Sequence, residues 1–144
     1  MAIRVQVVFD AADPEQLAAF WGEALGYKEE DPPAGFASWQ AWAEANGIPS
    51  GDWGNYASRV DPDGAGPRLF FQRVPEPKTA KNRVHLDLAV GGDRGTPPEQ
   101  RRSRVEAAVE RAVAAGATKL RAHDERDQHW VVLQDPEGNE FCLY

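Results

Sequence analysis

The sequence has 144 residues, the size of one ordinary domain, and 42% of them are hydrophobic, enough for a packed core. Its formal charge of −7 predicts a surface that repels phosphate backbones, so the composition argues against nucleic acid as a partner. A single cysteine, Cys142, excludes an internal disulfide and any multi-cysteine metal cluster.

The first ten residues lack the basic stretch, apolar run and cleavage site of a signal peptide. No apolar stretch is long enough to span a bilayer, so no membrane association is expected. The lone cysteine fits a reducing compartment, and we expect a cytoplasmic protein.

The first elements are a strand and a capped helix. Residues 3–10 are β-branched and aromatic, which predicts a strand buried on both faces. Asp13 can cap a helix in which Pro14 takes the first position, and Gly26 suits its left-handed end. The helix carries an apolar stripe with helical spacing, formed by Leu17, Phe20, Trp21, Ala24 and Leu25.

The rest of the first half is less regular. Residues 31–54 hold Trp39, Trp42 and Trp53 and indicate a short inserted helix or a lid-like loop. The composition predicts three more strands, with a turn before the last, over residues 27–30, 55–60 and 68–74. The polar, proline-bearing segment 75–82 is typical of a linker.

The second half follows the same order of elements. Thr96 is expected to cap its helix, with Pro97 first and Glu99 completing a capping box, and Gly116 to end it. The apolar stripe of this helix is Val105, Ala108, Val109, Ala112 and Val113. The expected strands are residues 83–90, 117–123, 129–134 and 139–144.

An internal repeat relates the two halves. Residues 4–7 match 83–86, and the turn 61–64 matches 135–138. The repeat predicts an α+β fold of two tandem βαβββ modules, 1–74 and 83–144, within a single domain spanning 1–144. The sheet of a single module has one face that nothing in that module covers. Two curved mixed sheets facing one another would make a partly closed barrel around a small-molecule pocket.

This layout resembles the vicinal-oxygen-chelate superfamily, which includes glyoxalases, bleomycin-resistance proteins and extradiol dioxygenases. The resemblance is carried by Asp13 with Phe20–Trp21 and residues 25–27 in the first module, and by residues 84–87, 115–117 and 135–141 in the second. Within the superfamily, residues 71–78 leading into 82–87 resemble the glyoxalase-like subgroup.

The resemblance implies four ligand positions for a divalent metal such as zinc, nickel, manganese or iron. His85 matches the first-strand position of module two, but Gln6 stands at the equivalent position of module one. Cys142 occupies the last-strand position, with Glu140 two residues earlier on the same face, and Gln72 is the counterpart in module one. Only His85 is a standard ligand, so His85 with Glu140 or Cys142 is the expected metal set, and a metal-free site remains open.

The expected catalytic residues are His85, Asp87 and Glu140, with Asp87 placed to orient His85. The expected pocket residues are Gln6, Gln72, Cys142, Trp39, Trp42, Trp53 and Trp130. Structural roles stay open as alternatives: a histidine satisfied by a neighbour, a small buried cysteine, a glutamate that fixes a turn, and tryptophans that belong to the core.

Two functions are consistent with these residues. The first is an enzyme of lyase, isomerase or dioxygenase type acting on a small oxygenated molecule. The second is a non-catalytic protein of the bleomycin-resistance type that sequesters a cationic aromatic compound, which the net charge and the tryptophan-rich insert favour. The resemblance also implies a homodimer.

Overall fold

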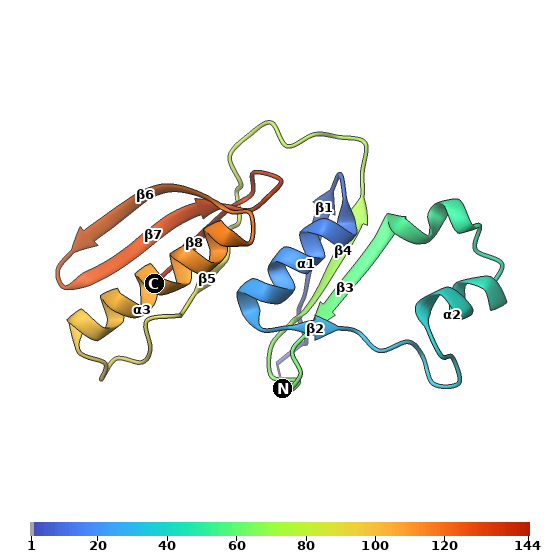
Figure 1. The fold of residues 1–144 in the computed structure, drawn as a ribbon, viewed down its shortest axis with the longest axis horizontal. Coiled ribbons are helices and arrows are strands. Elements are labelled where there is room, and N and C mark those ends of the chain that lie inside the picture. Colours follow the sequence, from blue (N-terminus) through green and yellow to red (C-terminus); the bar gives the residue numbers. More distant parts are fainter. Residues whose placement is uncertain (1) are drawn as a thin grey trace. The chain divides into compact units, whose positions relative to one another are not determined.

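The computed structural model describes residues 2–144, which form two compact units. The first unit ends at Pro77 and the second spans Lys78–Tyr144. Each unit contains a four-stranded mixed sheet that does not close, together with one long helix (Figure 1). The predicted α+β architecture of two βαβββ modules is confirmed.

The first unit has the sheet order β1-β4-β3-β2, in which β1 runs parallel to β4 and the other neighbours are antiparallel. The insert between β2 and β3 folds as a short α-helix and a short 3₁₀ helix, η1. The elements of this unit are β1 (Gln6–Ala11), α1 (Pro14–Leu25), β2 (Lys28–Glu29), α2 (Trp39–Ala45), η1 (Ser50–Asn55), β3 (Tyr56–Val60) and β4 (Arg68–Arg73).

The second unit repeats this plan with the order β5-β8-β7-β6, and β5 runs parallel to β8. Its elements are β5 (Asp87–Leu88), α3 (Pro98–Ala114), β6 (Thr118–Glu125), β7 (Gln128–Gln134) and β8 (Glu140–Leu143). No helix within residues 2–144 combines the length and the apolar character that crossing a bilayer requires.

Helix α1 forms as its sequence predicts. The Asp13 carboxylate accepts a hydrogen bond of 3.2 Å from the backbone N–H of Gln16, which satisfies one of the free donors at the helix start. Gly26 ends the helix at a φ of 68°, a conformation that glycine adopts without steric cost. The side chains of Leu17 and Trp21 are fully buried.

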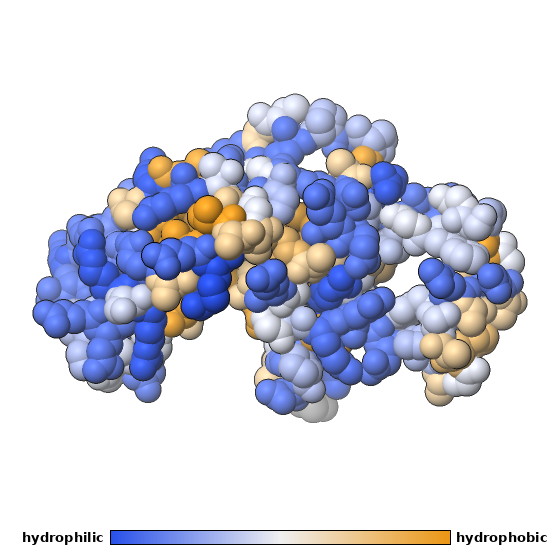
Figure 2. All heavy atoms as spheres, viewed as in Figure 1, coloured by the Kyte–Doolittle hydropathy of each residue, from blue (hydrophilic) through white to orange (hydrophobic). Residues whose placement is uncertain are grey.

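The core of each unit lies between its long helix and one face of its sheet. In the first unit, Phe9 of β1 lies between Trp21 of α1 and Phe71 of β4, with a ring-centroid distance of 5.0 Å to each. In the second unit, α3 packs on β7 and β8. The buried residues there are Val105, Ala108, Val109, Ala112, Val131, Leu133, Phe141 and Leu143. On the face drawn in Figure 2, hydrophilic residues cover most of both units.

Two expected strands are shorter or more exposed than predicted. β1 begins at Gln6 rather than Ile3, and it is not buried on both faces within its unit, because α1 covers only one of them. Val5 is 69% exposed. The strand expected over residues 83–90 is reduced to Asp87–Leu88, because its only partner is the short strand β8.

The start and the stripe of α3 also differ from the prediction. The helix begins at Pro98 with Pro97 as its N-cap, and no side chain caps it. Thr96 lies one residue before the N-cap position, where a turn holds it. Its hydroxyl donates a hydrogen bond to the Asp93 carboxylate, and its backbone N–H donates to the Asp93 carbonyl. Val113, predicted to lie in the buried stripe, is 45% exposed.

A buried histidine joins α3 to the sheet. His129 of β7 is 5% exposed, and its two ring nitrogens lie 2.8 Å from carboxylate oxygens of Asp124 in β6 and Glu106 in α3. An ionised carboxylate only accepts hydrogen bonds, so the doubly protonated ring satisfies both contacts. The hydrogen bond from His129 holds the pKa of Asp124 below its usual value. Partial burial raises the pKa of Glu106, but hydrogen bonds from His129 and Lys119 outweigh it and the net shift is downward.

Replacing His129 with glutamine should lower the free energy of unfolding by about 2 kcal/mol, because the variant cannot serve both carboxylates. Urea titration followed by circular dichroism measures this change. Arg102→Gln is the matched control, since it removes an exposed ion pair to the same Asp124, and it should lower the free energy of unfolding much less. Equal losses in the two variants would contradict the bridging role of His129.

Candidate functional site

The sheet register of the second unit places one row of side chains across its open face. Asp87 pairs with Cys142, Cys142 with Val132, and Val132 with Arg121. Paired residues in neighbouring strands project from the same face, so these four side chains share one face of the sheet. Their neighbours in sequence, such as Leu143, point to the opposite face and are buried with α3.

This open face carries a concavity of about 660 Å³. Its lining includes His85, Asp87, Cys142, Trp130, Arg121 and Lys81. The concavity lies entirely within the second unit, and it combines a small group of ligating side chains with basic and aromatic ones. Such a combination is typical of small-molecule sites, in which a few polar groups fix the orientation of the ligand.

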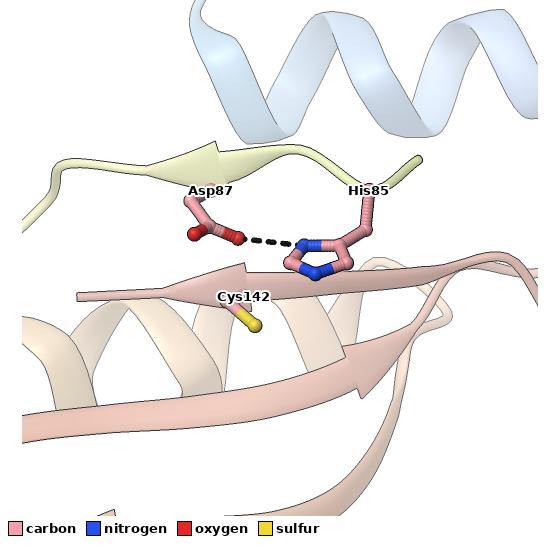
Figure 3. Close-up of side chains that lie close together, drawn as sticks. All are labelled: His85, Asp87 and Cys142. Carbon is pink, nitrogen blue, oxygen red and sulfur yellow. Dashed lines mark hydrogen bonds and ion pairs between the residues drawn. The ribbon is translucent and has the colours of Figure 1, made fainter. Parts of the chain in front are cut away.

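Three of the predicted site residues converge in this concavity (Figure 3). One ligand atom from each of His85, Asp87 and Cys142 lies within 4.8 Å of the others. His85 Nδ1 lies 2.9 Å from an Asp87 carboxylate oxygen, as the sequence predicts for an orienting carboxylate. Because the carboxylate accepts, Nδ1 carries the proton, and Nε2 remains available for a metal or for proton transfer.

Cys142 is held as a thiol in this cluster. Partial burial raises its pKa to about 11, and the charge of Asp87 and a hydrogen bond to it act in the same direction. Lys81 and Arg121 lower the pKa of Cys142, but their effect is smaller. The thiolate is the reactive form of cysteine, so Cys142 is a weak nucleophile at neutral pH unless another group removes its proton.

Glu140 lines the same concavity but is engaged elsewhere. Its carboxylate accepts a hydrogen bond of 2.9 Å from the backbone N–H of Asn82 and lies 3.3 Å from Nζ of Lys78. The hydrogen bond from Asn82 is the main reason why the pKa of Glu140 lies below its usual value. Glu140 therefore fixes the segment that precedes β5, and a ligand role for it would require these contacts to open.

The two glutamines expected in the site do not meet within the first unit. The Gln6 side-chain oxygen accepts from Arg68, while the Gln72 amide donates to Asp10. Gln6 pairs with Arg68 and Gln72 with Asp10, four residues further along the same two strands. Four strand residues span about 13 Å, so the two side chains cannot hold one ion between them.

Trp130 faces the concavity, where its ring stacks on His123 with a centroid distance of 5.0 Å and an angle of 11°. Trp130 is one of the pocket residues expected from the sequence. Sequence reasoning missed Arg121 and His123, which alternate on β6 toward the same face as Trp130. Side chains alternate along a strand, so the sequence of β6 places Arg121 and His123 on one face. Which face this is follows only from the pairing of β6 with β7.

Trp39, Trp42 and Trp53 line a different concavity, about 670 Å³, in the first unit. The Trp39 indole N–H donates to the Glu30 carbonyl at 2.7 Å, and the Trp53 indole N–H donates to the Ile48 carbonyl at 3.0 Å. Trp39 and Trp42 meet edge to face at 5.6 Å. The expected aromatic wall therefore exists, but it belongs to the insert and its own unit.

Comparison with known proteins identifies relatives across the whole chain. The family described as glyoxalase-like domain matches residues 6–144. No curated protein gives a significant match. A glyoxalase/bleomycin resistance protein/dioxygenase family enzyme from Burkholderia phytofirmans is 20% identical, with a TM-score of 0.54, and the alignment covers 97% of this chain and 94% of that one.

Two further solved structures share the fold. A glyoxalase/bleomycin resistance protein from Albidiferax ferrireducens is 20% identical, with a TM-score of 0.55 and coverage of 99% and 97%. The fosfomycin resistance protein FosX from Listeria monocytogenes, complexed with Mn(II) and 1S,2S-dihydroxypropylphosphonic acid, is 11% identical, with a TM-score of 0.62 and coverage of 100% and 92%. At such identities the likeness establishes the fold alone, and it is the match to the glyoxalase-like family that confirms the predicted resemblance.

Cys142 should react slowly with iodoacetamide at pH 7.5, more slowly than free cysteine, because its raised pKa keeps it protonated. Asp87→Asn should speed the reaction severalfold, since it removes the charge that raises the pKa of the thiol. Mass spectrometry of the alkylated protein over time measures both rates. His123→Gln, which alters the same face away from Cys142, is the control and should leave the rate unchanged. A slower or unchanged rate in Asp87→Asn would contradict this account.

Proposed function

Because the chain belongs to the glyoxalase-like domain family, we propose that it is an enzyme that holds a divalent metal at His85, Asp87 and Cys142 and acts on a small oxygenated molecule. The observation that carries the proposal is the approach of three ligating atoms to within 4.8 Å of one another inside a ligand-sized concavity. Of the residues expected from the sequence, these three support a common centre.

The donor set suits zinc best among the expected metals. A histidine nitrogen, a cysteine sulfur and a carboxylate oxygen are the three ligand types that zinc accepts in proteins. Manganese prefers oxygen, so the sulfur of Cys142 distinguishes this site from one built for Mn(II). Three protein ligands leave one position of a tetrahedral site for a substrate oxygen.

A bound zinc ion would supply Lewis-acid polarisation of a substrate oxygen without redox chemistry, which favours an isomerase or lyase over a dioxygenase. The chain's own residues orient and exchange protons. In Figure 3, Asp87 holds the His85 ring through a hydrogen bond at Nδ1, and a metal held by both residues would replace the proton between them. Trp130 and Val132 supply an apolar wall that limits the access of water to the reacting end.

Purified protein should bind zinc with a one-to-one stoichiometry, and His85→Ala and Cys142→Ala should each weaken binding by at least about tenfold. Affinity should rise with pH, because the Cys142 proton must leave when the metal binds. Competition with a chromophoric chelator at pH 6.5, 7.5 and 8.5 measures both effects.

His123→Ala serves as the control for that titration, since it removes a histidine from the same face but outside the cluster. It should bind zinc like the parent protein. Zinc binding that survives the loss of both His85 and Cys142, or that does not depend on pH, would eliminate the proposed centre.

The first unit favours a second candidate function, the sequestration of a cationic aromatic compound. Its concavity is walled by three tryptophans and by the stacked pair Tyr56 and Phe70, whose centroids lie 5.7 Å apart. Its two arginines are neutralised: Arg59 lies 2.7 Å from Glu15 and Arg68 2.5 Å from Glu30. The remaining carboxylates, Glu29 and Asp52, leave the lining acidic, and cations bind well over electron-rich rings.

Titration with bleomycin and with a methylated acridinium dye should quench tryptophan fluorescence if this second function is correct. Trp42→Ala should weaken binding at least about tenfold, because loss of one stacking partner costs roughly 1–2 kcal/mol. Trp130→Phe, in the second unit, is the matched control and should bind normally. Equal affinity for the parent protein and Trp42→Ala would remove the support for sequestration at this site.

A further inference from the structure

We propose that Lys81 and Arg121 bind an anionic oxyacid group, a carboxylate or a phosphate, in the second-unit concavity beside His85, Asp87 and Cys142. The inference rests on the proposed function, because it names the substrate class of the same site. The chain as a whole is strongly acidic, and that charge by itself would favour a cationic ligand.

In the described part of the chain, the side chains of Lys81 and Arg121 lack partners, as does that of Arg94, a third cation of the lining. Among residues 2–144, neither Lys81 nor Arg121 has a hydrogen bond or a carboxylate within ion-pair distance. Most other cations of this unit near the sheet are engaged: Arg102 with Asp124, Lys119 with Glu106, and Lys78 with Glu140. Lys81 and Arg121 therefore bring uncompensated positive charge to the concavity that they line.

The carboxylates that line the concavity are already engaged by the chain. Asp87 accepts from His85, and Glu140 accepts from Asn82 and Lys78. Asp93 accepts from the N–H of Gly95 and the hydroxyl of Thr96. A ligand that enters this space therefore meets free cations and occupied anions, and an acidic group is the complementary chemistry.

The register fixes how far the anionic group lies from the ligating cluster. Arg121 and Cys142 belong to one row across the sheet and are separated by Val132 on the strand between them. Two strand spacings are about 10 Å between Cα atoms, and the long arginine side chain shortens the gap to the ligand. Val132 supplies an apolar floor beneath the middle of the molecule. This spacing suits a small molecule with oxygen atoms at one end and an acid group at the other.

Lys81 lines the same concavity and lies four residues before His85 in the sequence. The backbone N–H of the next residue, Asn82, is held by Glu140 of β8, so the position of Lys81 along the sheet is fixed. The charges of both Lys81 and Arg121 act on Cys142, where each lowers the pKa of the thiol. Both cations thus lie within electrostatic reach of the cluster.

The test uses metal-free full-length protein labelled with ¹⁵N and titrated separately with inorganic phosphate and with acetate. Both anions should shift the amide signals of β6 and of residues 80–88. Arg121→Gln and Lys81→Gln should each weaken binding at least fivefold, and Arg121→Lys should retain part of it. The stronger of the two anions in the parent protein identifies the acid group that the site prefers.

Arg102→Gln is the matched control, because Arg102 is already paired with Asp124, and its affinity for both anions should equal that of the parent protein. Both test residues are exposed, so the variants should keep the parent melting temperature. Absence of binding for both anions, or equal affinity in Arg121→Gln and the parent protein, would overturn the inference. Zinc binding is measured separately, without anions. If zinc binds and the anions do not, only the anion site is rejected. If zinc does not bind, the metal centre is rejected whatever the anion titration shows.

Discussion

Everything at the candidate site depends on the packing of α3 against one face of the second sheet. Val131, Leu133, Phe141 and Leu143 are buried there because each contributes apolar area that water would otherwise cover. Side chains alternate along a strand, so burial of these residues commits their neighbours to the open face. Cys142, Val132 and Trp130 reach the concavity for this reason, and no separate interaction is needed to aim them.

The fold could be predicted because its signals are local. Asp13 and Gly26 mark the ends of α1 through their own backbone chemistry, and the repeat of strand, helix and turns gives the module plan. The prediction failed where a residue engages a different hydrogen-bond partner from the expected one. Thr96 was expected to cap α3, but Asp93 holds it in the preceding turn. The choice of Gln72 as the counterpart of Cys142 stays a prediction, to which the strand register adds that Gln72 pairs with Asp10.

The site was predictable only in part, for a related reason. His85, Asp87 and Cys142 could be placed because the repeat defines two strands, which carry Asp87 and Cys142, and His85 lies just before the first of them. Arg121 and Lys81 could not, because the proposed anion site rests on their having no partner among the described residues, which a sequence does not record. The two units have also diverged at matching positions. If Gln6 corresponds to His85, then the pair Val8 and Phe70 in the first sheet corresponds to Asp87 and Cys142 in the second. Duplication has thus produced one apolar and one polar version of the same strand pair.

Glu140 could serve either as a structural anchor or as a metal ligand, but its carboxylate cannot do both at once. Its carboxylate anchors the segment that carries Lys81, through the N–H of Asn82. Were that carboxylate to swing toward His85 and coordinate an ion, the tether would break and the lysine would drift from its place beside the cluster. A variant of this chain that uses Glu140 as a metal ligand would therefore need another anchor for Lys81 to keep the proposed anion site.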